Sequence, residues 1–169
     1  MLAQDMEIRF ARRADVPVIA ELIRALATYE KLAHEVVGTE ADLALHLFGP
    51  RPYAQVLLAE NRNEVLGFAL FFYNFSTFLA KPGLYLEDLF VRPEARGRGT
   101  GKALLSRLAE EALAQGCGRL EWSVLDWNAP AIAFYRSLGA AELSGWTVNR
   151  VSGAALSALA GRPAASASE

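Results

Sequence analysis

Seven residues near the middle of the chain, Arg96-Gly97-Arg98-Gly99-Thr100-Gly101-Lys102, have the composition of a phosphate-binding loop. Three glycines in five residues let the backbone turn with its N–H groups facing inward. A helical pattern begins directly behind the loop, so the positive end of a helix dipole would add to the attraction for an anion. Arg92, Arg96, Arg98 and Lys102 supply local positive charge. The segment therefore predicts a site that holds phosphates without a metal.

Two common nucleotide motifs do not fit this loop. The nucleoside triphosphate pattern G-x-x-x-x-G-K-[ST] fails because Arg96 takes the place of the first glycine and Ala103 that of the hydroxyl residue. The dinucleotide pattern G-x-G-x-x-G fails because Lys102 replaces the third glycine. What remains is R-x-x-G-x-G, formed by Arg96, Gly99 and Gly101. By itself this pattern also fits a glycine-rich connection that binds nothing.

The elements that would position the loop follow from hydrophobic periodicity and capping residues. Helices are expected after a cap at Asp15, after a capping box at Thr39–Asp42, from Ala103 to Gly116, and over 129–138. Strands are expected over 7–10, 56–60, 64–73, 84–91, 120–125 and 146–151. A loop containing Ser76, Thr77 and Lys81-Pro82-Gly83 would precede the strand over 84–91.

This order predicts an α/β fold, with a mixed sheet and helices on both faces. We expect one domain over residues 1–160. Residues 161–169 consist of Gly, Arg, Pro, Ala, Ser and Glu and bury too little to fold, so they should form a flexible tail.

Composition limits the classes of partner. The chain has 169 residues, of which 53% are hydrophobic and 21% charged, and its formal net charge is −2. No overall field would therefore recruit nucleic acid or an anionic membrane. Cys117 is the single cysteine, which favours a reduced, cytoplasmic setting, and we expect neither a signal peptide nor a membrane span. His34 and His46 lack ligand-like spacing, so we predict no metal.

Together with the loop, further segments along the chain resemble one family of enzymes. R-x-x-G-x-G resembles the pyrophosphate loop of the GNAT N-acetyltransferases, which bind acetyl-coenzyme A (acetyl-CoA). Leu84–Val91 resembles the splayed central strand of that family. Asp126-Trp127-Asn128 with Ala133–Ala140 resembles the second part of the family's acetyl-CoA site, here called the second half-site. The segment Ala27–Leu32, with the Leu-Tyr-Leu-Glu-Asp strand, is similar to the spermidine/spermine acetyltransferase-like branch. That branch includes diamine and thialysine acetyltransferases.

The resemblance implies a GNAT fold with a splayed, mostly antiparallel central sheet and acetyl-CoA as co-substrate. It implies a small cationic amine as acceptor, such as a polyamine, a diamine, thialysine or a lysine-like amine. The residues expected to contact acetyl-CoA come from the strand end, the glycine loop and the second half-site: Leu89, Phe90, Val91, Arg96, Gly97, Arg98, Gly99, Thr100, Gly101, Lys102, Asn128 and Tyr135.

Acetyl transfer to an amine requires a neutral nitrogen, whereas an alkyl amine with a pKa of about 10.4 is protonated at neutral pH. Glu87 is the candidate base, since a carboxylate on a mostly apolar strand is costly unless it is used or paired. It could instead point to solvent or pair with an arginine. Glu87 and Asp88 are neighbours, so a bulge is needed to bring both to one side. The resemblance places such a bulge here, with an N–H near Leu89 polarising the thioester carbonyl.

The resemblance also places Tyr135 beside the cofactor sulfur, where it would protonate the leaving thiolate. Tyr135 could otherwise be an aromatic core residue. The residues expected to line the acceptor site are acidic, aromatic or hydroxylic, with one leucine from the second half-site: Tyr29, Glu30, Ser76, Thr77, Glu87, Asp88, Leu125, Asp126 and Trp146. Ser76, Thr77, Leu125 and Asp126 are more similar to the thialysine-acting members, whereas Arg98 and the segment 78–81 depart from their pattern.

Two alternatives stay open at this point. An enzyme of the same fold could acetylate a protein lysine, a protein N-terminus or an aminoglycoside. The chain could also be a non-catalytic CoA-binding regulatory module, although it retains both Glu87 and Tyr135. The family resemblance further implies a homodimer, with exchanged contacts near the last strand.

Overall fold

The computed structural model describes residues 6–62 and 64–162. The chain divides into two compact units, Met1–Trp127 and Asn128–Glu169, which are described separately below. The helices and strands of the first unit are β1 (Met6–Phe10), α1 (Val16–Tyr29), α2 (Glu40–Phe48), β2 (Gln55–Asn61), β3 (Glu64–Ser76), β4 (Lys81–Val91), α3 (Thr100–Ala114) and β5 (Leu120–Trp122). Those of the second unit are α4 (Ala129–Ser137) and α5 (Gly153–Leu159).

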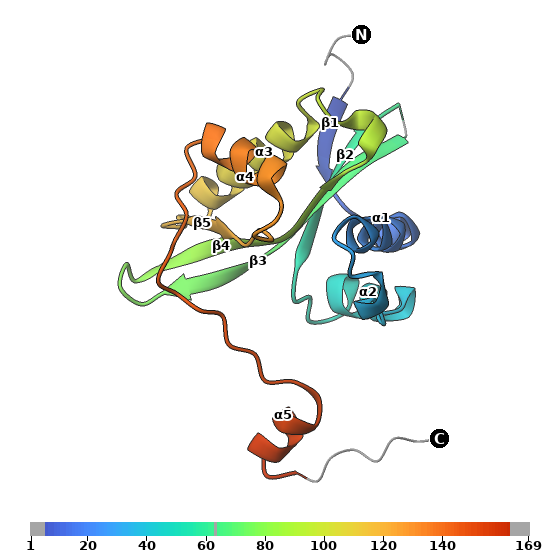
Figure 1. Ribbon diagram of the computed structural model, residues 1–169. Coiled ribbons are helices and arrows are strands. Elements are labelled where there is room, and N and C mark those ends of the chain that lie inside the picture. The colour runs from blue at the N-terminus through green and yellow to red at the C-terminus, as the bar shows by residue number, and fades with distance from the viewer. Residues whose placement is uncertain (1–5, 63, 163–169) are drawn as a thin grey trace. The chain divides into compact units, whose positions relative to one another are not determined.

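The first unit is built around one five-stranded sheet in the order β1-β2-β3-β4-β5. Neighbours from β1 to β4 are antiparallel, and β5 runs parallel to β4. Helices α1 and α2 lie on one side of this sheet and α3 on the other (Figure 1). The mixed, mostly antiparallel sheet with helices on both faces is therefore confirmed.

Alternating strand residues divide the core between the two faces of the sheet. On the α1 side, Phe68 of β3 and Phe90 of β4 belong to one buried cluster with Ile19, Leu22 and Leu26 of α1. The next residues along β2 and β3 point to the opposite face, where α3 is buried through Leu104, Leu105 and Leu108. Burial on both faces explains the uninterrupted apolar run of β2 over residues 56–59.

Capping residues set most helix boundaries where the sequence predicts them. Thr39 Oγ1 accepts a hydrogen bond from the Asp42 N–H at 3.2 Å, and Asp42 Oδ2 accepts one from the Thr39 N–H at 2.9 Å, which is the expected capping box. Gly116 and Gly139 follow their helices with φ of 69° and 87°. Asp15 does not cap α1 with its side chain. It instead accepts from the Arg12 N–H at 2.6 Å and forms an ion pair with Arg9 at 2.8 Å.

Four predicted boundaries are wrong, each by three residues. Helix α3 begins at Thr100 and not at Ala103, so the last residues of the glycine loop form its first turn. Strand β3 continues to Ser76 and β4 begins at Lys81, which leaves only residues 77–80 as the turn. The fifth strand ends at Trp122 and not at residue 125.

The predicted strand over 146–151 is also wrong, because the structure gives these residues no strand. A strand needs a hydrogen-bonded neighbour, and no ladder in the described residues includes this segment. Trp146 and Val148 are 85% and 84% exposed, so burial does not stabilise the segment either. Helix α5 follows this segment and is not predicted from the sequence. The predicted tail lies outside the described residues from residue 163 onward, and the single-domain assignment stays a prediction.

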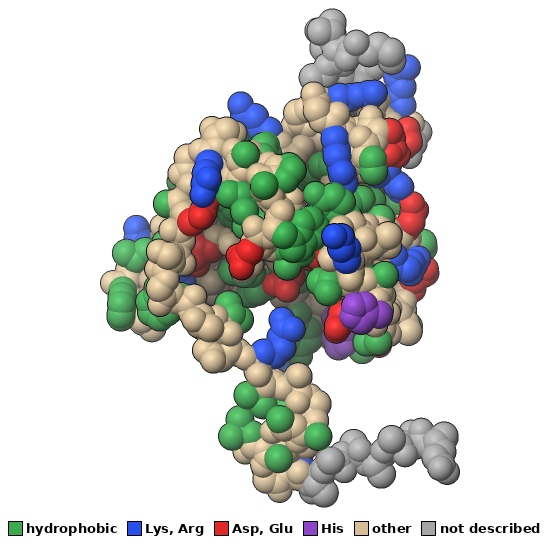
Figure 2. Space-filling view, in the orientation of Figure 1, with side chains coloured by type: hydrophobic (Ala, Val, Ile, Leu, Met, Phe, Trp, Pro, Cys, Tyr) green, Lys and Arg blue, Asp and Glu red, His purple; other side chains and the backbone are tan. Residues whose placement is uncertain are grey.

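The surface carries mixed charge. Lys and Arg side chains are scattered among acidic ones on the face shown in Figure 2 rather than gathered into one patch. Among the described residues, no helix combines the length and the apolar character that crossing a membrane requires.

Candidate active site

The glycine loop has the backbone of an anion site. Gly97 and Gly99 adopt φ of 71° and 86°, a region that favours glycine, and the space where their Cβ atoms would lie is open. Gly99 is the N-cap of α3 and provides no side-chain cap. The first intrahelical bond runs from the Ala103 N–H to the Gly99 carbonyl at 2.9 Å, so the preceding N–H groups point out of the helix end. This geometry fits the pyrophosphate of acetyl-CoA.

The four basic side chains near the loop divide into two pairs. Arg92 forms an ion pair with Glu21 at 2.7 Å, and the Arg96 Nε donates to the Val91 carbonyl at 2.9 Å. The Arg96 guanidinium also lies over the rings of Tyr29 and Phe90, at 4.9 and 5.5 Å from their centroids. Arg98 and Lys102 are exposed and form no ion pair within the described part of the chain. Those two side chains remain available for phosphates.

Strand β4 has an open edge next to the loop. Its pairing with β5 covers only Leu84–Leu86 in the described residues. The Arg92 N–H donates to the Leu66 carbonyl of β3 at 2.8 Å. Because successive N–H groups alternate in direction, those of Leu89 and Val91 point to the opposite, open edge. The sheet is therefore splayed where the sequence predicts it, and Leu89 presents a main-chain donor there.

A β-bulge at Glu87 brings two acidic residues together. Leu86 pairs with Phe71 and Asp88 with Leu70, so Glu87 is the extra residue in β4. The bulge reverses the alternation of the strand and turns Asp88 to the same side as Phe90, which faces α1. Glu87 is exposed, and Asp88 is partly buried.

A third carboxylate joins this pair from the end of α1. Burial, together with the charges of Glu87 and Glu30, raises the pKa of Asp88 to about 6. Burial also raises the pKa of Glu30. We call Glu30, Glu87 and Asp88 the acidic cluster. A carboxyl group whose pKa lies near neutrality can both accept and release a proton under physiological conditions.

Two aromatic side chains lie at the C-terminal end of α1, where Glu30 of the acidic cluster is the C-cap residue. The Tyr29 and Trp127 rings are 6.1 Å apart, and both are partly exposed. Arg96 lies over the Tyr29 ring, and Lys31 lies over the Trp127 ring at 5.2 Å. Cations of the chain itself therefore contact both members of the pair. Lys31 has no role among the predicted site residues, although its adjacency to Glu30 could have signalled one.

The remaining predicted acceptor residues of the first unit lie apart from the cluster or beyond β5. Ser76 and Thr77 are at the β3–β4 turn, where the Ser76 Oγ accepts from the Leu79 N–H at 3.3 Å. Ser76 pairs with Lys81, seven residues before Asp88, so the two sites are roughly 20 Å apart along β4. Leu125 and Asp126 lie in the loop after β5, and Asp126 is exposed.

The second unit holds the other predicted residues. Asn128 caps α4, with its Oδ1 accepting from the Ala131 N–H at 3.4 Å, as the sequence suggests. Tyr135 is on α4, half-buried, with its ring 5.4 Å from that of Phe134. Trp146 lies in the extended segment before α5 and is 85% exposed.

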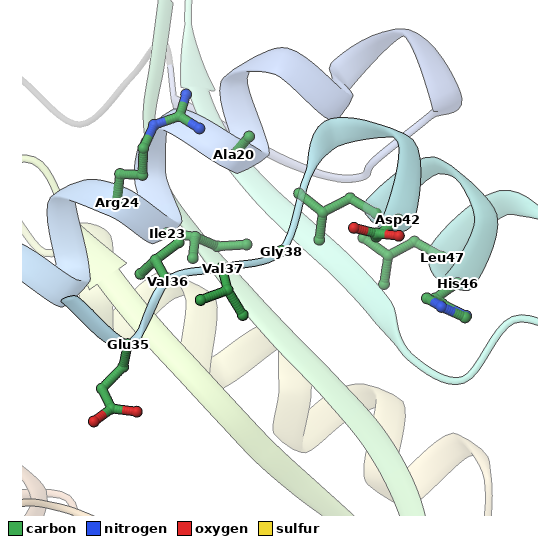
Figure 3. A pocket seen from close by; sticks show the side chains of 11 residues that line it. Ala20, Ile23, Arg24, Glu35, Val36, Val37, Gly38, Asp42, His46 and Leu47 are labelled. Atoms are coloured by element: carbon green, nitrogen blue, oxygen red, sulfur yellow. The ribbon is translucent and has the colours of Figure 1, made fainter. Parts of the chain in front are cut away.

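A separate pocket of about 350 Å³ lies between α1, the segment 35–38 and α2. Ile23, Val36 and Val37 lie together there, whereas Glu35 points away from them (Figure 3). None of the predicted site residues lines this pocket. In the described residues, no three His, Cys, Asp or Glu side chains come together as a metal site.

Comparison with known proteins agrees with this geometry. Residues 18–140 match the Acetyltransferase (GNAT) family. The chain is 39% identical to a thialysine N-epsilon-acetyltransferase of Bos taurus, covering 92% of this chain and 97% of the relative. It is 36% identical to the L-ornithine N5-acetyltransferase NATA1 of Arabidopsis thaliana, covering 90% and 86%. The structure of an integron cassette protein of V. cholerae superposes with a TM-score of 0.78 at 29% identity, covering 92% and 98%.

The chain therefore belongs to the GNAT acetyltransferase family. It is an acetyl-CoA-dependent N-acetyltransferase that acts on an amine. Its relatives also confirm the predicted branch, near the thialysine-acting members.

Proposed function

We propose that the protein transfers acetyl from acetyl-CoA to a primary amine of a small cationic metabolite, by direct attack in a ternary complex. The observation that carries this proposal is the acidic cluster beside the open edge of β4, where Asp88 has a pKa of about 6. When bound, acetyl-CoA supplies the acetyl group as a thioester. Thialysine, ornithine, lysine-like amines, diamines and polyamines are the acceptor candidates that the relatives and the sequence suggest.

The acidic cluster would bind the ammonium form of the acceptor and then remove one proton from it. The sequence predicts Glu87 as the base that removes this proton. The raised pKa favours Asp88 as the acceptor of that proton, with Glu87 beside it on the bulge. The neutral nitrogen then forms a bond to the acetyl carbon while the bond from that carbon to sulfur breaks. The second proton that the nitrogen loses on becoming an amide leaves to solvent, from which the Tyr135 phenolate regains the proton it gives to the thiolate. No covalent enzyme intermediate is needed.

Residues of β4 and α3 would hold the co-substrate. The N–H groups at the start of α3, with the exposed side chains of Arg98 and Lys102, would bind the pyrophosphate. Thr100 is buried and donates its hydroxyl to the Ala95 carbonyl at 3.2 Å, so its role is to fix the loop. The Leu89 N–H would donate to the thioester oxygen, where negative charge develops.

Tyr135 would give its phenolic proton to the leaving thiolate. A thiol has a pKa of about 8.5, so its departure needs only a weak acid. Tyr135→Phe should lower kcat about 100-fold with little change in the KM for acetyl-CoA. Turnover equal to wild type across the pH range would remove Tyr135 from this role.

The proposal includes a cytoplasmic homodimer. The single cysteine supports the cytoplasmic setting, and the exposed apolar residues of the second unit, such as Trp146 and Val148, support the dimer. Light scattering after gel filtration should give twice the monomer mass of 18.4 kDa.

The test of the proposed function is release of CoA from acetyl-CoA, followed by thiol detection. Spermidine, spermine, diamines, thialysine, lysine, ornithine and a no-amine control form the panel. Release that depends on one group of amines would support the proposal. Tight binding of acetyl-CoA without release would instead favour a protein substrate or a regulatory module.

A further inference from the structure

Lys31 holds an unusual backbone position at the end of α1. Its N–H donates to the Thr28 carbonyl at 3.1 Å, and the Leu32 N–H donates to the Ala27 carbonyl at 2.8 Å. These two bonds form a Schellman motif, in which the residue at the position of Lys31 is usually glycine. Lys31 has φ of 63°, a backbone conformation that favours glycine, yet the residue carries a long side chain. An outlier of this kind points to a use for the side chain.

The Lys31 side chain lies over an aromatic ring and not on a carboxylate. Its Nζ is 5.2 Å from the centroid of the Trp127 ring. Lys31 is exposed, and across residues 6–62 and 64–162 it forms no ion pair, although Glu30 is its neighbour in sequence. Its charge is therefore free to meet an anion from solvent.

Charges of opposite sign lie next to each other around this position. Glu30, adjacent to Lys31, belongs to the acidic cluster that would take the acceptor amine. The other cation at the Tyr29–Trp127 pair, Arg96, is occupied by the Val91 carbonyl and two aromatic rings. A polyamine extending from the cluster toward Trp127 would bring a second cation against Lys31. A carboxylate group of the acceptor in the same place would instead be attracted to the Lys31 ammonium group.

We propose that Lys31 binds the carboxylate of the acceptor and thereby selects diamino monocarboxylic acids over polyamines and diamines. This assignment rests on the proposed amine acetyltransferase activity. The acidic cluster would hold the side-chain ammonium group of such an acceptor, and Lys31 would hold the carboxylate at its other end.

The experiment compares two acceptor pairs that differ only in the carboxylate. These are L-ornithine with putrescine and L-lysine with cadaverine, each diamine corrected for its two equivalent amines. The wild-type protein should have a kcat/KM about tenfold or more higher for the amino acid of a pair, as expected for one charge-assisted contact.

Lys31→Met removes the charge and keeps a long side chain. It should raise the KM for the amino acids about tenfold and leave putrescine and cadaverine unchanged or faster. Lys31→Arg should restore part of the preference. Lys81→Met, which removes another exposed lysine at the start of β4, is the matched control and should behave as wild type.

The outcomes separate this inference from the function on which it rests. Collapse of the amino-acid preference in Lys31→Met alone would support the assignment. Equal use of both members of each pair by the wild type, or an equal loss for both in Lys31→Met, would overturn it while leaving the acetyltransferase function intact. Absence of turnover with every amine would overturn the proposed function and this inference together.

Discussion

Glu87 is the extra residue of a β-bulge immediately before Asp88, and this places two consecutive strand carboxylates in one cluster. In a regular strand they would point to opposite faces. The bulge shifts the register between β3 and β4, and the pairing of β4 with β5 ends at Leu86, directly before it. The acidic cluster and the open edge of β4 therefore begin at the same position of the strand.

Asp88→Asn should stabilise the protein above about pH 6. The folded state raises the pKa of Asp88 from 3.8 to about 6, so it binds the proton more tightly than the unfolded chain does. Stability should therefore fall as the pH rises from about 4 to 6, and stay lower above that range. Removing the charge should recover up to about 3 kcal/mol at pH 8, at about 1.4 kcal/mol per pKa unit.

Urea unfolding of the wild type and Asp88→Asn at pH 4 and pH 8 measures the difference in their free energies of unfolding. The increase in this free energy caused by Asp88→Asn should be present at pH 8 and small at pH 4. A gain of equal size at both values would show that the Asp88 charge is not the cause.

The acid limb of the pH profile of kcat/KM should identify the residue that accepts the proton from the amine. If Asp88 accepts the proton, the wild-type limb has its midpoint near pH 6, and Asp88→Asn loses about 100-fold in kcat/KM. Glu87→Gln removes a charge that raises the pKa of Asp88, so the midpoint should move to lower pH. Loss of the limb in Glu87→Gln, with the limb intact in Asp88→Asn, would return the role to Glu87.

Gly99→Ala should weaken binding of acetyl-CoA. A side chain at φ of 86° is strained and would enter the open space above the start of α3, where the pyrophosphate is expected. We expect the Kd for CoA, measured by calorimetry, to rise at least tenfold. Gly38→Ala is the matched control, because its Cβ also meets open space and its φ lies outside the left-handed region. An unchanged Kd in Gly99→Ala would contradict the placement of the phosphates.

Lys31→Gly should stabilise the protein while Lys31→Ala should not. Glycine removes the strain of φ 63°, which amounts to about 1 kcal/mol, whereas alanine keeps the Cβ that causes it. The Tm of Lys31→Gly should rise by about 2 to 4 °C. A rise of the same size in Lys31→Ala would mean that the side-chain charge, and not the backbone, determines the effect.

Local signals explain which parts of the fold could be predicted from the sequence. The capping box at Thr39, the glycines behind α3 and α4, and the apolar run of β2 depend on neighbouring residues and are found where expected. The prediction of a last strand over 146–151 is wrong because a strand forms only beside a hydrogen-bonded partner strand, which alternation of apolar residues does not guarantee. Trp146 and Val148 have the right pattern, but no strand of the described residues pairs with them.

The site shows the same limit. The loop 96–102 and the need for a bulge at Glu87 could be derived from residue types and strand alternation. The pKa of Asp88 could not, because it depends first on burial in the folded chain and then on the charges of Glu87 and Glu30, of which Glu30 is distant in sequence. The position of Lys31 over Trp127 likewise joins residues far apart in the chain.

Mass analysis of an amine acceptor after reaction tests the central claim most directly. L-ornithine is incubated with acetyl-CoA and either the wild-type protein or the double variant Glu87→Gln/Asp88→Asn, and binding of CoA to both is measured in parallel. The account predicts one added acetyl group on the side-chain amine with the wild type, and at least a 100-fold lower rate with the double variant at unchanged CoA affinity. A double variant as fast as the wild type would contradict the claim that the acidic cluster activates the amine.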